Sequence, residues 1–447
     1  MDKRKTVIYQ INLRMFTPEG TLSAAQKFLP HIADLGVTAV YLCPVNRASD
    51  DRDERFWSFR QKKNKLGNPK NPYRLQDFYA IDEEYGTEED LRDFIREAHR
   101  HGLLVMLDLV YMHCGPDANI ISLSPDSVKR DENGAIRHTQ YNFPILNFDC
   151  RATREHLIEN MLYFVRDLDA DGFRCDVGDA VPLDFWREAK SELLKIKPNL
   201  ILLNEGCNPE YVRSGVFDWN YNLPPVVLLP AEVLPVKVDV GFGSFLLQNE
   251  KTLAEIVRDN FHRYIAGGNG KNGIYYLESH DVVTDEDRFD AVLPSACVDA
   301  LFVYIFMADG IPFLYAGNEF ADSHEQCMFA NRFYNRGYGT DWSRLAQPEG
   351  QRRLQLIRDL IRLRRATPAV LCGDFCWLSE ERNNLHFVRE WEGKTVTVFI
   401  NFGSPITVRT KGKVFLSSVF NTQNCGEYLV EQYGFIVAEE LEVSENT

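Results

Sequence analysis

The chain has 447 residues, enough for one large domain and a smaller one. Its 45% hydrophobic and 26% charged residues are typical of a globular protein, so a disordered or fibrous chain is excluded. The net charge of −15 argues against nucleic acid and anionic membranes as partners, because both require a basic surface. A neutral ligand is compatible with this charge.

Three further features predict a cytoplasmic protein. Ten cysteines in a chain of this length do not form the dense disulfide framework of a small secreted domain. The N-terminal residues are charged and lack an apolar segment before a cleavage site. No apolar run reaches the length of a transmembrane helix. We therefore expect a soluble protein in a reducing compartment.

Apolar segments that end in polar residues alternate with helical patterns along most of the chain. Eight segments are typical of strands, and they cover residues 7–11, 39–42, 103–108, 172–176, 200–205, 215–218, 274–277 and 311–315. Helical patterns cover residues 22–35, 88–101 after the N-cap Thr87, and stretches near 153–168, 183–195, 244–264, 292–308 and 350–366. Continuous apolar strands that alternate with helices indicate a parallel sheet covered on both faces. Eight such units in roughly 350 residues favour an α/β fold of the closed (β/α)8 TIM-barrel type.

Two regions interrupt this alternation. Residues 112–150 lie between the third strand and its helix and contain turn-forming residues, which predicts a short insertion where barrel active sites are built. After residue 368 the pattern becomes that of β-strands, at residues 385–388, 395–399 and 434–437. We predict a barrel domain over residues 1–368, including the 112–150 insertion, and a C-terminal antiparallel β-domain over residues 369–447.

Acidic residues stand at the carboxyl ends of four predicted strands, where the side chains of a barrel face its pocket. The third strand ends at Asp108, the fourth at Asp176 and the fifth at Glu205, and the seventh leads into Asp281. Burying an isolated carboxylate costs roughly several kcal/mol, so any single one could be half of a structural ion pair. Four at one barrel mouth are better explained by chemistry.

Two carboxyl groups at this place suit hydrolysis of a glycoside with retention of configuration. That reaction uses an ionised carboxylate below the anomeric carbon and a protonated carboxyl beside the leaving oxygen, about 5 Å apart. Adjacent strands lie about 4.8 Å apart, so side chains of the fourth and fifth strands can reach this separation. Arg174 lies on the same face as Asp176 and is expected to keep it ionised by lowering its pKa, whereas Glu205 needs a raised pKa.

The sequence resembles the α-amylase family of glycoside hydrolases over nearly its whole length. The resemblance rests on residues 108–113 (DLVYMH), 172–176 (GFRCD), Glu205 and His280-Asp281, with flanking matches at residues 85–87 (YGT) and 310–319 (GIPFLYAGNE). It implies an enzyme that cleaves α-linked glucose oligosaccharides or polysaccharides by double displacement through a glycosyl-aspartate.

The resemblance also implies a role for each matched residue. Asp176 would be the nucleophile, Glu205 the general acid/base, and Asp281 the group that binds hydroxyls of the distorted reacting sugar. The other matched residues would bind or orient: Tyr73 would stack on the sugar, His113 and His280 would hydrogen-bond it, Arg174 would orient Asp176, and Asp108 would support the site. Taken alone, His113 could be a core histidine and Tyr73 a loop-packing residue.

The resemblance implies no cofactor for the reaction. Family members often bind a structural calcium through an asparagine just before the first-motif histidine, but this chain has Met112, a poor ligand for a hard cation. We therefore do not expect that calcium site. Two alternatives stay open: a transglycosylase (glucanotransferase) would pass the glycosyl group to a sugar hydroxyl instead of water, and a non-catalytic relative would only bind carbohydrate.

Overall fold

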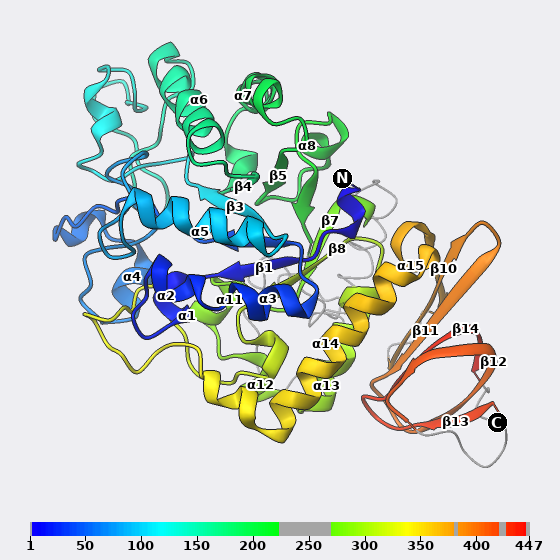
Figure 1. Ribbon diagram of the computed structural model, residues 1–447. Helices are drawn as coiled ribbons and strands as arrows, with labels where there is room; N and C mark the ends of the chain where they lie inside the picture. Colours follow the sequence, from blue (N-terminus) through cyan, green and yellow to red (C-terminus); the bar gives the residue numbers. More distant parts are fainter. Residues whose placement is uncertain (1, 223–269, 380–382, 420–425, 444–447) are drawn as a thin grey trace.

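A closed barrel of eight parallel strands forms the centre of the computed structural model, which describes residues 2–222, 270–379, 383–419 and 426–443 (Figure 1). Each barrel strand pairs with its neighbours in sequence, and β8 pairs with β1 to close the ring. The strands are β1 (Ile8–Ile11), β2 (Ala39–Leu42), β3 (Leu104–Leu109), β4 (Gly172–Cys175), β5 (Ile201–Asn204), β6 (Trp219–Tyr221), β7 (Gly273–Tyr276) and β8 (Ile311–Tyr315). The predicted TIM barrel is confirmed.

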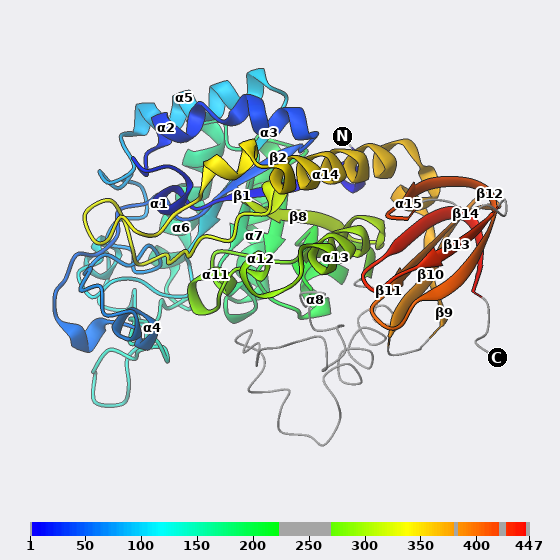
Figure 2. The same ribbon diagram turned by 90° about the horizontal axis from the view of Figure 1, so that it is seen from below.

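Helices lie in the connections around the barrel (Figures 1 and 2). They are α1 (Leu13–Phe16), α2 (Leu22–Gln26), α3 (Leu29–Leu35), α4 (Phe59–Lys63), α5 (Glu88–Arg100), α6 (Arg151–Arg166), α7 (Leu183–Ile196), α8 (Pro209–Arg213), α11 (Val282–Asp285), α12 (Phe289–Val292), α13 (Ser295–Met307), α14 (Pro348–Ala366) and α15 (Pro368–Cys372). None of the helices in the described ranges has both the length and the hydropathy needed to span a bilayer.

Two predicted elements differ from the structure, and a third lies outside the described residues. The sixth strand was expected at residues 215–218, but β6 begins at Trp219 because Gly215 adopts a positive φ and the next residues form a turn against α8. The single helix expected over residues 22–35 is two helices: α2 ends at Gln26, and Pro30, which has no N–H to donate to the Gln26 carbonyl, lies in the first turn of α3. The expected helix at 244–264 falls outside the described ranges.

A second sheet, antiparallel throughout, follows the barrel in the chain. Its strand order is β13-β12-β14-β11-β10-β9, and the strands are β9 (Asp374–Ser379), β10 (Asn384–Trp391), β11 (Lys394–Asn401), β12 (Ile406–Ser417), β13 (Glu427–Val430) and β14 (Phe435–Val443). It packs against α13 and α15 (Figures 1 and 2). Helix α13 is buried from Cys297 to Met307 because it lies between the barrel and this sheet. The predicted C-terminal β-fold is confirmed, and the exact domain limits stay a prediction.

Two long connections at the carboxyl ends of the strands shape the site. Residues 112–150 hold a short 3-10 turn, Asn119–Ser122, and isolated β-bridges, in line with a small insertion. The connection between β2 and α5, residues 43–87, is also long and was not foreseen as an insertion. It carries α4 and Tyr73.

Candidate active site

One buried arginine gathers three carboxyl groups at the carboxyl ends of the barrel strands. The Arg174 side chain, on β4, is 1% exposed. Its Nη1 donates to Oδ1 of Asp108 and to Oδ1 of Asp176, both at 2.8 Å, and its Nη2 lies 2.7 Å from Oε1 of Glu205. Asp108 belongs to β3, Asp176 follows β4 and Glu205 follows β5. Residues from three neighbouring strands therefore meet at one guanidinium group.

The charges of this cluster do not balance. One guanidinium faces three carboxyl groups and cannot offset the cost of burying each of them. Burial, and after it the charge of Glu205, raises the pKa of Asp176 well above its ordinary value. Burial also raises the pKa of Glu205. The expected lowering of the Asp176 pKa is thus wrong, because Arg174 is shared among three carboxyl groups. The carboxyl groups of Asp176 and Glu205 titrate as a pair, and the pair keeps one proton at a pH where isolated carboxyl groups have lost theirs.

Asp281 lies beyond β7, directly before α11, and its side chain is 36% exposed. Its Oδ1 accepts a hydrogen bond from Nη1 of Arg60 at 2.7 Å, and its Oδ2 lies 3.2 Å from Nε2 of His280. Burial alone would raise the pKa of Asp281, but its interactions with His280, Arg60 and Arg174 hold the pKa below its ordinary value. Asp281 is therefore ionised at neutral pH, and its negative charge helps to raise the pKa of Glu205.

The backbone is strained immediately after Asp176. Val177 has φ 41° and ψ 44°, a left-handed conformation that a β-branched residue rarely adopts. In this conformation the Val177 N–H donates to Oε2 of Glu205 at 2.7 Å. The next residue must be small, since a Cβ on Gly178 would lie 2.2 Å from Oδ1 of Asn204. The turn thus ties the carboxyl of Glu205 to the strand that carries Asp176.

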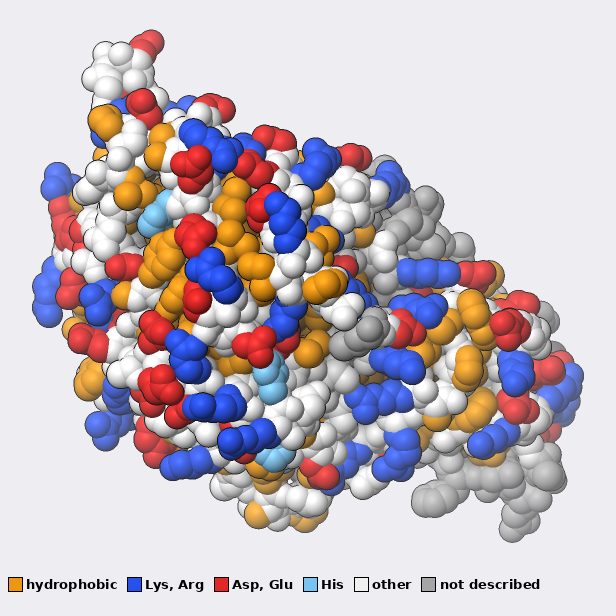
Figure 3. Space-filling view, turned by 45° about the horizontal axis from the view of Figure 1, so that its top comes forward, with side chains coloured by type: hydrophobic (Ala, Val, Ile, Leu, Met, Phe, Trp, Pro, Cys, Tyr) orange, Lys and Arg blue, Asp and Glu red, His pale blue; other side chains and the backbone are white. Residues whose placement is uncertain are grey.

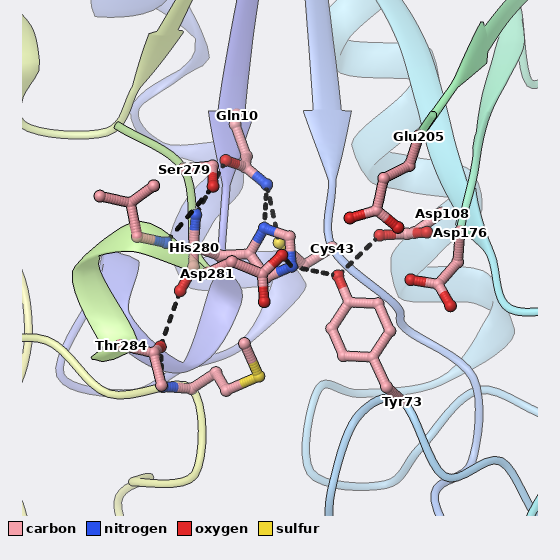
Figure 4. Close-up of polar contacts among 12 residues, drawn as sticks. Gln10, Cys43, Tyr73, Asp108, Asp176, Glu205, Ser279, His280, Asp281 and Thr284 are labelled. Carbon is pink, nitrogen blue, oxygen red and sulfur yellow. Dashed lines mark hydrogen bonds and ion pairs between the residues drawn. The ribbon is translucent and has the colours of Figure 1, made fainter. Parts of the chain in front are cut away.

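Tyr73 connects the two groups of acidic side chains, and Figure 4 shows it between them. Its hydroxyl donates to Oδ2 of Asp108 at 2.8 Å and lies 2.5 Å from Nε2 of His280. Its ring stacks on the His280 ring with centroids 5.3 Å apart and an interplanar angle of 13°. The Arg174 guanidinium lies 5.8 Å from the centre of the Tyr73 ring, within cation–π range. The predicted stacking of Tyr73 on a sugar stays a prediction.

His113 is enclosed by protein groups. It is 3% exposed, and its Nε2 donates to the carbonyl oxygen of Tyr73 at 2.8 Å. Burial lowers the pKa of His113 to about 4, so the ring is neutral at pH 7. Its Nδ1 is buried without a hydrogen-bond partner among the described residues. The predicted hydrogen bond from His113 to a sugar is not tested by these contacts.

The position where the family resemblance would place a calcium ligand is apolar. Met112 packs against the main hydrophobic core, and a thioether there does not fit a hard cation. Within the described ranges, no group of three or more His, Cys, Asp or Glu side chains could hold a metal ion. The residues present do not fit the calcium site, and no step proposed below uses one.

Three residues in the site were missed from the sequence. Tyr41, on β2, donates its hydroxyl to Oδ2 of Asp108 at 2.5 Å, and Gln10, on β1, contacts the ring of His280. Both are polar residues inside apolar strands, a signal that could have identified them. Arg60 lies on the short helix α4, and nothing in its local sequence marks it.

Comparison with known proteins relates this geometry to a family. A family model described as "Alpha amylase, catalytic domain" matches residues 9–140, which include Tyr73, Asp108 and His113. A cyclomaltodextrinase from Geobacillus thermopakistaniensis is 24% identical over 466 residues, which cover 94% of this chain and 70% of the relative. Over residues 9–140 and along most of its length, the chain is therefore similar to the α-amylase family.

Two further proteins are similar to this chain. A maltogenic α-amylase from Bacillus acidopullulyticus is 25% identical over 86% of this chain and 62% of its own length. The chain thus spans about two thirds of the length of these two relatives. The crystal structure of an α-amylase from Lactobacillus plantarum has a TM-score of 0.74 at 24% identity, covers 98% of this chain and 99% of its own, and shows the same fold.

Proposed function

We propose that this chain is a retaining glycoside hydrolase that cleaves α-glucosidic linkages in maltooligosaccharides or α-glucans. One observation carries the proposal: Asp176 and Glu205 contact the two terminal nitrogens of one buried arginine. The names of the relatives, a cyclomaltodextrinase and a maltogenic α-amylase, support α-linked glucose as the substrate class. A net charge of −15 suits a neutral sugar and supports the expectation that nucleic acid is not a partner.

In the first proposed step, an oxygen of Asp176 forms a bond to the anomeric carbon while the bond to the leaving oxygen breaks. Glu205 gives its proton to that oxygen. The pair retains a proton because both carboxyl groups have raised pKa values. We place this proton on Glu205 because the reaction needs an ionised nucleophile and a protonated acid, and the 28% exposed side chain of Glu205 is the one open to a leaving oxygen. Asp281, being ionised, favours the positive charge that develops on the sugar ring.

In the second proposed step, a water oxygen attacks the anomeric carbon and gives a proton to Glu205. The bond between that carbon and Asp176 breaks, and the carboxylate is regenerated. Two inversions at one carbon leave the product with the configuration of the substrate. Arg174 stays bound to Asp176 and Glu205 through both steps and keeps the two carboxyl groups in place.

The test uses three single variants on maltoheptaose. Asp176→Asn removes the nucleophile and should lower kcat/KM by about 10⁴-fold or more. Glu205→Gln should lower it comparably, yet much less on an α-glucoside of an acidic phenol, which leaves without a proton. Glu210→Gln, an exposed acid on α8, should change neither value and serves as the control. Activity that survives in Asp176→Asn would refute the proposal, as would inverted product seen by NMR at early times.

The same assay separates the alternatives. At high oligosaccharide concentration, products longer than the substrate would identify a transglycosylase, because the glycosyl group then passes to a sugar hydroxyl. Binding of maltoheptaose without turnover in the unmodified chain would identify a non-catalytic relative.

We also propose a cytoplasmic location and a reaction without a cofactor. Five buried cysteines of the described ranges are free thiols, which suits a reducing compartment: Cys43, Cys114, Cys175, Cys297 and Cys327. Fractionation of the source cells tests the location. Activity and melting temperature measured with EDTA and with added calcium test the cofactor prediction, and a loss of either with EDTA would contradict it.

A further inference from the structure

Gln10 lies on β1 inside the barrel, fully buried, and both ends of its amide contact His280 (Figure 4). The amide oxygen accepts a hydrogen bond from the backbone N–H of His280 at 3.2 Å. The amide nitrogen lies 2.6 Å from Nδ1 of His280 and 3.4 Å from the Cys43 sulfur. A backbone N–H can only donate, so the oxygen end of the amide must face it and the NH₂ end must face the ring.

This orientation determines where the imidazole carries its hydrogen. The NH₂ group can only donate, so Nδ1 must accept, and the single ring hydrogen resides on Nε2. Nε2 lies 2.5 Å from the Tyr73 hydroxyl and 3.2 Å from Oδ2 of Asp281. The Tyr73 hydroxyl donates its own hydrogen bond to the Asp108 carboxylate, so the hydroxyl oxygen can accept a hydrogen bond from Nε2 of His280. A continuous donor-to-acceptor chain therefore runs from Gln10 to Asp108.

We propose that Gln10 is a positioning residue that fixes His280 as the neutral, Nε2-protonated tautomer and thereby holds Tyr73 and Asp281 in their reactive positions. The consequence for catalysis rests on the proposed function, whereas the tautomer of His280 does not. The residue acts through His280 and has no contact of its own with the reacting atoms.

The charges around His280 are mixed and do not by themselves set its protonation. The groups that face it are Asp281 from its own segment, Tyr73 and Arg60 from the 43–87 connection, Asp108 from β3 and Arg174 from β4. The acids favour the charged ring and the arginines oppose it. A second proton on Nδ1 would point at the hydrogens of the Gln10 NH₂ group. In agreement, burial lowers the pKa of His280 to about 4.

Gln10→Glu tests the proposal, because it keeps the shape of the side chain but presents an acceptor to Nδ1. The introduced carboxylate should raise the pKa of His280 and draw a hydrogen onto Nδ1. Below that pKa the doubly protonated ring still donates from Nε2. Above it the remaining hydrogen stays on Nδ1 and the donor to Tyr73 and Asp281 disappears. We expect kcat/KM of the variant to fall roughly tenfold as pH rises through this pKa, a loss that the unmodified chain lacks.

Two controls isolate the tautomer. Gln10→Met is neutral and offers no acceptor to Nδ1, so it should lack the loss at alkaline pH. In a His280→Gln background, Gln10→Glu should add no pH-dependent step, because the group that titrates is gone. If Gln10→Glu shows the profile of the unmodified chain, or keeps its pH step in the His280→Gln background, the proposal is wrong.

The ¹⁵N NMR signals of labelled histidine read the tautomer directly in the full chain, with His280 assigned by its loss in His280→Gln. The proposal requires protonated Nε2 and bare Nδ1 in the unmodified chain from about pH 5 to pH 9. A hydrogen on Nδ1 there would overturn it even if Gln10→Glu does not fold. If the unmodified chain cleaves no maltooligosaccharide, the proposed function fails, and these signals still decide the present inference.

Discussion

Each of two arginine side chains in this site contacts more than one carboxyl group, and this sharing affects which carboxyl groups are protonated. Arg174 is divided among three carboxyl groups, which leaves a proton on the pair Asp176 and Glu205. Arg60 contacts two, since its Nη1 binds Asp281 and its Nε binds Oδ1 of Asp285 at 2.9 Å. Asp281 therefore keeps its charge while it stays 36% exposed to a ligand.

Replacing Arg60 by glutamine should raise the pKa of Asp281, because one of the positive charges that lower this pKa, and the hydrogen bond from it, are removed. Asp281 would then take up a proton at higher pH, so the acid limb of the kcat/KM profile should move to higher pH. At neutral pH we expect kcat to fall about tenfold, as for the loss of one charge-assisted hydrogen bond. Arg55→Gln, on an exposed side chain paired with Asp53, should leave the profile unchanged. An acid limb that does not move in Arg60→Gln would contradict this prediction.

At the scale of elements, the two ends of the barrel strands differ in the polar groups that they carry. The carboxyl ends carry the acids of the site, whereas the amino ends are tied together by polar contacts. Asp171, just before β4, accepts from Nε2 of His99 on α5 at 2.7 Å and from the N–H of Val105 on β3 at 2.8 Å. It also lies 2.7 Å from Nζ of Lys197, which follows α7. One carboxylate therefore joins four elements.

Asp171→Asn should lower the free energy of unfolding by about 1–3 kcal/mol. Burial opposes the charge of Asp171, but His99, Lys197 and the Val105 N–H outweigh it and lower its pKa, so its contribution is lost as pH falls below about 4. The hydrogen bond to Asp171 raises the pKa of His99, so that contribution is present below about 6.5 and lost as pH rises through the raised value.

The difference in unfolding free energy between Asp171→Asn and the unmodified chain should therefore be largest between about pH 4 and pH 7. Urea unfolding across this range measures it. Asp169→Asn removes a neighbouring acid that also contacts His99 and Lys197 but is 66% exposed, and it should change stability by less than about 0.5 kcal/mol. A difference that stays constant with pH would contradict the assignment.

At the scale of the whole molecule, buried arginines join the C-terminal sheet to the barrel. Arg364 on α14 donates to the carbonyls of Phe306 and Ala308, and Arg389 on β10 donates to those of Met307 and Ala308. These carbonyls stand at the C-terminal end of α13, where the helix dipole favours positive charge. Elsewhere the charges are dispersed: Figure 3 shows Lys and Arg interspersed with Asp and Glu over one face.

Arg389→Lys keeps the charge but loses the planar fork that reaches three carbonyls, including that of Gly373. We expect it to lower the free energy of unfolding by about 1–3 kcal/mol, because buried carbonyls lose their donor. The kcat at low temperature should stay unchanged, since the site residues belong to the barrel. Arg409→Lys, on an exposed pair with Glu427 in the same sheet, is the control. Thermal unfolding measures both, and equal melting temperatures would contradict the role of Arg389.

The sequence by itself determined the barrel, the C-terminal β-fold and the residues at the strand ends. Apolar periodicity is a local property, and polar residues that end buried strands mark a barrel mouth without knowledge of any contact. The same local pattern failed at β6, where buried residues of a turn, Val216 and Phe217, have the composition of a strand.

Only the tertiary structure decided which charges meet. Gln10 and His280 are 270 residues apart, and Arg60 and Asp281 are 221 apart, so no local pattern relates them. The raised pKa of Asp176 likewise depends on three carboxyl groups sharing Arg174, a count that appears only when strands β3, β4 and β5 lie side by side. Protonation is set by all charges around a group, and the fold places those charges.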